Sequence, residues 1–133
     1  MAIIIRANYK REGISFFTPD EFSQQLGYMN RPKGYIIEPH IHKHLERKVL
    51  YTQEVLIIRS GRVRVDFYDE KQNYLESRTL CEGDVILLAS GGHGFEFIED
   101  SEVVEVKQGP YSSIENDKVK FRNIKKGSVS GRL

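Results

Sequence analysis

The stretch EVLIIRSGRVRVDFY, residues 54–68, decides the predicted fold. Its first half is rich in β-branched residues and ends in a Ser-Gly dipeptide, which is typical of a tight turn. In its second half, Val63, Val65 and Phe67 alternate with polar residues, the pattern of a strand with one buried and one wet face. The stretch therefore predicts a β-hairpin.

Strand-sized segments with turn residues between them continue from residue 34 to residue 107. Phe95 and Phe97 alternate with Glu96, and residues 102–107 alternate again. Short strands at regular spacing favour an all-β sandwich or barrel. One helix is expected before them, over residues 19–25, because Thr18 can cap its start and Gly27 can end it.

Length and charge restrict the classes of protein that fit. The chain has 133 residues, which suits a single domain over residues 1–133. Twenty basic and nineteen acidic residues give a net charge of +1, so neither nucleic acid nor a membrane surface is an expected partner. The chain holds one Cys and no apolar stretch of membrane-spanning length, and we expect a cytoplasmic protein.

The histidines are the side chains most suggestive of chemistry. His40 and His42 are two positions apart, so on a strand both would point to the same face. Glu54 opens an otherwise apolar segment, and His93 lies among glycines. Imidazole and carboxylate groups together are typical ligands of transition metals. The alternatives are a solvated strand edge for the histidine pair, a loop position for His93 and a surface position for Glu54.

Two spacings resemble the signatures of the cupin family. The first is Gly-x5-His-x-His from residue 34 to residue 42, followed by Glu-x6-Gly from residue 54 to residue 61. The second is Gly-Asp-x4-Ala-x-Gly-x-His, residues 83–93. The resemblance implies a double-stranded β-helix, the jelly-roll or cupin barrel, over residues 34–124. A segment with the short helix, residues 1–33, would precede this barrel, and a flexible tail, residues 125–133, would follow it.

The same resemblance implies a metal centre. Its cofactor would be one divalent transition metal ion, Fe, Mn, Ni or Zn, and its ligands would be three histidines and one glutamate: His40, His42, Glu54 and His93. The sequence departs from the family in the eleven residues between His42 and Glu54, where three or four are usual. The insertion carries His44, which could join or replace a ligand.

The expected function is a metal-dependent isomerase or epimerase for a small carbohydrate-like or other polar metabolite. His44 and Glu105 are the candidate proton-transfer residues. Four more side chains are candidates for substrate binding: Arg47, Lys48, Phe95 and Phe97. A non-haem dioxygenase using the same ligands, or a non-catalytic cupin that binds a small molecule, are the alternatives.

Apolar residues that the barrel would not cover predict a homodimer. Val55 and Ile57 lie on the face opposite Glu54, and residues 3–5 are all isoleucine. A monomer of this size should not leave so much apolar surface in water. We therefore expect two barrels to pack back to back with two-fold symmetry, each lending its N-terminal segment to the other. The alternative is that this segment folds over the outer face of its own barrel.

Overall fold

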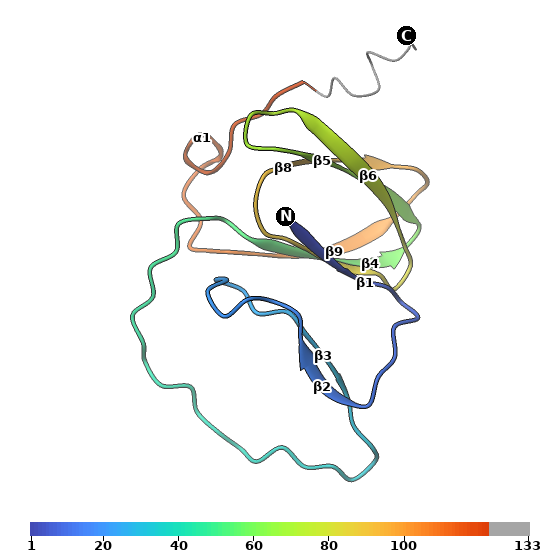
Figure 1. The fold of residues 1–133 in the computed structure, drawn as a ribbon, viewed down its shortest axis with the longest axis vertical. Helices are drawn as coiled ribbons and strands as arrows, with labels where there is room; N and C mark the ends of the chain where they lie inside the picture. The colour runs from blue at the N-terminus through green and yellow to red at the C-terminus, as the bar shows by residue number, and fades with distance from the viewer. Residues whose placement is uncertain (123–133) are drawn as a thin grey trace.

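The computed structural model describes residues 1–122, and every strand pairing among them is antiparallel (Figure 1). The predicted tail, residues 125–133, lies outside this range. The strands are β1 Ala2–Ile5, β2 Gly13–Phe16, β3 Gly27–Asn30, β4 Glu54–Ser60, β5 Arg62–Tyr68, β6 Tyr74–Cys81, β7 Val85–Leu88, β8 Gly92–Phe97 and β9 Glu102–Lys107. One short helical segment, α1 Ile114–Asp117, follows them. The all-β class is confirmed, and no helix in the described range is long and apolar enough to cross a membrane.

Two sheets pack face to face around the core. The larger has the order β1-β7-β4-β9 and the smaller the order β6-β5-β8, while β2 and β3 form a separate hairpin. The core cluster draws on both sheets: Leu56, Ile58, Val63, Val65, Phe67, Leu80, Ile86 and Leu88. The two sheets do not close into a barrel within the described residues, because β8 and β9 each pair on one side only.

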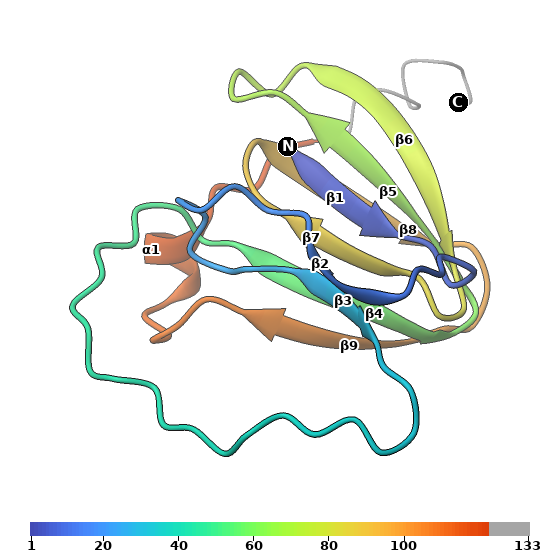
Figure 2. The same cartoon turned by 60° about the horizontal axis from the view of Figure 1, so that its bottom comes forward.

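The β2–β3 hairpin lies on the side of the larger sheet away from the smaller one (Figures 1 and 2). Leu87 alternates along β7 with the core residues Ile86 and Leu88, so it faces this outer side. Leu87 is nevertheless 0% exposed. The continuous apolar sequence of β7 therefore matches a strand that is covered on both faces.

The predicted hairpin over residues 54–68 is wrong, although both of its strands form. β4 pairs with β7 and β9, and β5 pairs with β6 and β8, so the two strands belong to different sheets. Gly61 lies between them with φ 86°, a conformation that favours glycine. The chain turns a corner there, and the apolar faces of β4 and β5 meet across the core.

The predicted helix over residues 19–25 is also wrong. The Thr18 hydroxyl accepts the Leu26 amide, 3.2 Å away, instead of capping a helix. The side-chain amide of Gln25 donates to the carbonyls of Pro19 and Phe22, at 2.9 and 3.0 Å. Side chains thus satisfy the backbone groups that a helix would use, and the segment remains an irregular turn between β2 and β3.

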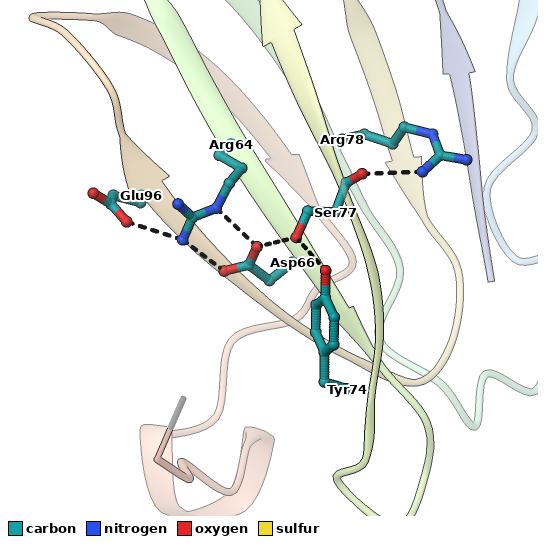
Figure 3. Close-up of polar contacts among 6 residues, drawn as sticks. All are labelled: Arg64, Asp66, Tyr74, Ser77, Arg78 and Glu96. Atoms are coloured by element: carbon teal, nitrogen blue, oxygen red, sulfur yellow. Dashed lines mark hydrogen bonds and ion pairs between the residues drawn. The ribbon is translucent and has the colours of Figure 1, made fainter. Parts of the chain in front are cut away.

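The outer face of β5 is less wet than the sequence pattern predicts, because a polar cluster covers it (Figure 3). Asp66 is only 1% exposed. Arg64 donates to both of its carboxylate oxygens, at 2.9 and 3.0 Å, and Ser77 donates to one of them. Arg64 also pairs with Glu96 at 2.9 Å. The cluster joins β5, β6 and β8 with charge-assisted hydrogen bonds.

Asp84 ties the end of β1 to the turn before β7. Its carboxylate accepts the backbone amides of Ala7 and Cys81, both at 2.8 Å, and pairs with Arg6 at 2.9 Å. Burial raises the pKa of Asp84, but the hydrogen bonds from Cys81, Ala7 and Arg6 outweigh burial, so the pKa lies below its ordinary value.

The substitution Asp84→Asn should lower the free energy of unfolding at pH 7 by about 1–3 kcal/mol, because a buried charged acceptor is lost. A lowered folded-state pKa means that the stabilisation is complete above the ordinary value of 3.8 and is lost as the pH falls below it. The difference from the wild type, measured by urea denaturation, should therefore shrink below that pH. Glu82→Gln, an exposed neighbour, is the control and should change little.

Candidate functional site

A pocket of about 1200 Å³ opens between the two sheets, on the side where β8 and β9 have free edges. Glu54 at the start of β4, His93 on β8 and Glu105 on β9 supply its polar groups. Phe95 and Phe97 on β8 supply apolar wall. Alternation places these β8 side chains on the strand face that carries His93. The pocket thus combines apolar walls with a few convergent polar groups, as ligand sites do.

A contact across the pocket joins the two sheets. Nε2 of His93 lies 2.9 Å from Oε2 of Glu54. The two side chains are 27% and 15% exposed, so water reaches them only partly. The hydrogen bond from His93 is the largest cause that lowers the pKa of Glu54, to about 2, against the opposing effect of burial. Glu54 is therefore ionised over the physiological pH range.

Glu105 shares the site with Glu54. The hydrogen bond to Glu54 is the largest cause that raises the pKa of Glu105, and burial raises it further. Two neighbouring carboxyl groups thus have pKa values that environment pushes in opposite directions, which is the arrangement found in acid–base sites. Glu54 keeps its charge, and Glu105 is the carboxyl that binds a proton more readily.

A third carboxylate, that of Asp117, also lines the pocket. Nζ of Lys107 is 3.6 Å from Oδ2 of Asp117 on α1, and the Thr52 hydroxyl donates to Oδ1 of Asp117 at 2.9 Å. The sequence does not single out Asp117 as a site residue. The signal available for Lys107 was that it shares a strand face with Glu105. No comparable signal existed for Asp117, because its place depends on how the chain returns after β9.

The structure brings together two of the four predicted metal ligands, Glu54 and His93. The strand predicted through His40 and His42 does not form, and both residues lie in a loop. We call residues 32–52 the long loop, and all of them are exposed. The rings of His40 and His42 contact one another, with 5.2 Å between their centroids. Nδ1 of His40 lies 2.9 Å from the Glu38 carbonyl oxygen. Among residues 1–122, no group of three or more His, Cys, Asp or Glu side chains is placed to hold a metal ion.

The other predicted site residues divide in the same way. Glu105 lies beside Glu54, and Phe95 packs against the core next to the pocket. The long loop carries His44, Arg47 and Lys48, and all three are exposed. In this conformation, the candidate site residues that follow the long loop in the sequence line the pocket. The candidates within the long loop do not.

Comparison with known proteins finds no similar protein: the chain matches no protein-family model, no curated protein and no solved structure. The site must therefore be interpreted from its own geometry and chemistry.

The substitution His93→Ala should raise the pKa of Glu54 from about 2 toward its ordinary value of 4.5, because the largest lowering cause is removed. Carboxyl carbon chemical shifts followed by NMR from pH 1.5 to pH 7 measure this directly. His44→Ala, which alters an exposed loop residue, is the control and should leave Glu54 unchanged. An unchanged Glu54 titration in His93→Ala would contradict the geometry of the pair.

Proposed function

We propose that the pocket between the sheets binds a small polar metabolite, such as a carbohydrate, and moves a proton on it as an isomerase or epimerase does. The contact between Glu54 and His93, with Glu105 beside it, is the observation that supports this proposal. Such an enzyme removes a proton from one carbon and returns it to the same or a neighbouring carbon. It therefore needs groups that accept and donate protons within one pocket.

Each residue has a role that follows from its contacts. Glu54 accepts a hydrogen bond from Nε2 of His93, which fixes the orientation of the ring and leaves Nδ1 as the ring nitrogen that can take up a proton from the substrate. Glu105 is the proton donor, because its carboxyl group binds a proton more readily than an ordinary glutamate. Lys107 supplies a cation near the carboxylates, and Phe97 supplies a wall for the apolar face of a sugar ring.

The metal ion remains part of the proposal as a cofactor, with His40, His42, Glu54 and His93 as its ligands. The described residues as they stand do not fit it, because they place only Glu54 and His93 together. We therefore derive no step through a metal. A bound ion would require the long loop to bring His40 and His42 to the pocket, and residues around them to join a sheet as a strand. The same step would extend the sandwich toward the proposed double-stranded β-helix.

Incubation in deuterated water with a panel of aldoses, ketoses and their phosphates tests the catalytic proposal. Proton NMR should show deuterium replacing hydrogen on a carbon next to the carbonyl of one class of sugar. Glu105→Gln should slow this exchange by roughly 10²- to 10⁴-fold, the usual contribution of a positioned acid or base. Glu76→Gln, an exposed carboxyl on β6, is the matched control. Sugar binding without exchange would contradict catalysis and favour a binding protein, and substrate-dependent oxygen uptake would favour a dioxygenase.

Elemental analysis of protein purified without added metal tests the cofactor. We expect about one transition metal ion per chain, and its loss in the double variant His40→Ala/His42→Ala. Binding should weaken as the pH falls through about 6.5, because the imidazole ligands must be deprotonated. Lys43→Ala, between two histidines of the loop, is the control and should keep the ion. Metal retained in the double variant would contradict ligation by the loop.

A further inference from the structure

We propose that the long loop of a second copy of this chain adds to the free edge of β8 as a strand, so that two copies exchange loops and each covers the other's pocket. The part that concerns the pocket rests on the proposed function. The exchange itself rests on the unpaired strand edge, the exposed apolar loop and the place where the loop leaves the fold.

The first observation is an open edge beside the pocket. β8 pairs with β5 alone, so backbone groups along its other side have no strand partner within the described residues. Proteins rarely leave such an edge bare next to apolar side chains, because it is a template for another strand. Phe97 at the end of β8 is 58% exposed, and His93 and Phe95 line the pocket directly beneath this edge.

The second observation is an unusually apolar loop. Ile41 is 93% exposed and Ile36 is 77% exposed, and other large apolar side chains of the loop are also in water: Tyr35, Ile37, Leu45, Leu50 and Tyr51. Apolar residues occur at both even and odd positions from residue 35 to residue 41. An added strand of this segment would therefore have apolar residues on both faces, which suits a strand covered on both sides.

The contacts where the long loop joins β4 favour pairing of β8 with the loop of a second copy over pairing with the loop of the same chain. Gln53 is buried, its backbone oxygen accepts the Gln108 amide at 2.9 Å, and its side-chain oxygen accepts the Gln24 amide at 3.0 Å. These contacts fix the direction in which the loop leaves β4. In Figures 1 and 2 the loop runs away from the body of the chain instead of across β8.

Charge also suits the exchange. Residues 33–48 contain four Lys or Arg, two Glu and three His, so the loop has a net positive charge. The carboxyl groups of Glu54 and Glu105 line the pocket. Each chain thus carries a segment that can form a strand, the long loop, and a strand edge that lacks a partner, that of β8. A two-fold symmetric dimer would pair the loop of each copy with the β8 edge of the other. His40 and His42 of one copy would then lie over Glu54 and His93 of the other.

Engineered cysteines test which chain supplies the strand. Ile41 lies between His40 and His42, and Gly94 lies between His93 and Phe95, so both would face away from the pocket on neighbouring strands. Nothing lies within 4 Å of a Cβ placed on Gly94, so a cysteine fits there. In a Cys81→Ser background, Ile41→Cys with Gly94→Cys should form a disulfide-linked dimer at micromolar concentration. Ile41→Cys with Thr79→Cys, on the opposite edge of the same sheet, is the control and should not.

A second measurement uses the exposure of Ile36, which shares the parity of His40 and His42 and would face the pocket on the added strand. A residue 77% exposed in the single chain should tolerate an aspartate without loss of folding. We expect light scattering to give about twice the 15.4 kDa of one chain for the wild type, and Ile36→Asp to weaken dimerisation by at least about 100-fold. Leu75→Asp, an exposed apolar residue on β6, is the control and should remain dimeric.

The outcomes separate this inference from the proposed function. A disulfide within one chain, the absence of any disulfide, or a monomeric wild type would overturn the exchange and leave the pocket chemistry standing. A dimer with exchanged loops that holds no metal and incorporates no deuterium into any sugar would support this inference and count against the proposed function.

Discussion

The corner at Gly61 is the constraint on which the arrangement of the sandwich depends. A Cβ on this residue would clash with Oγ of Ser101 and with the Asp100 backbone oxygen, so only glycine fits beside the turn before β9. Because the chain changes sheets here, β4 and β5 lie on opposite sides of the core instead of pairing. Glu54 at the far end of β4 can then face His93, which β8 carries in the sheet of β5.

From residue 54 onward the sequence predicted the strands better than their pairing, for a physical reason. Alternation at Val63, Val65 and Phe67 reports which face of a strand is buried, and those residues are in the core. It does not report which strand lies alongside, because a Ser-Gly turn can close a hairpin or turn a corner between sheets. The choice depends on contacts with residues 100 and 101, forty positions later in the chain.

The candidate site residues divide by the kind of segment that carries them. Glu54, His93 and Glu105 lie on strands and line one pocket; alternation along the strands bore on Glu54 and Glu105, whereas His93 entered the site through the resemblance to the cupin signatures. The prediction for His40 and His42 depended on a strand that does not form in the single chain. Periodicity shows that a segment can be a strand, but a strand also needs an edge to pair with, and the edge is a property of the assembled sheets.

The exposed long loop and the open pocket would therefore be resolved by the same contact, a strand paired with β8. Full burial of one isoleucine side chain contributes about 1.5–3 kcal/mol, and the loop leaves several large apolar side chains in water. The free edge of β8 lies where such a segment would also complete the wall of the pocket. A partner strand would shield the contact between Glu54 and His93 from water, which would strengthen its electrostatic interaction. Assembly and chemistry would then depend on the same segment, because the apolar loop that becomes buried also carries His40 and His42.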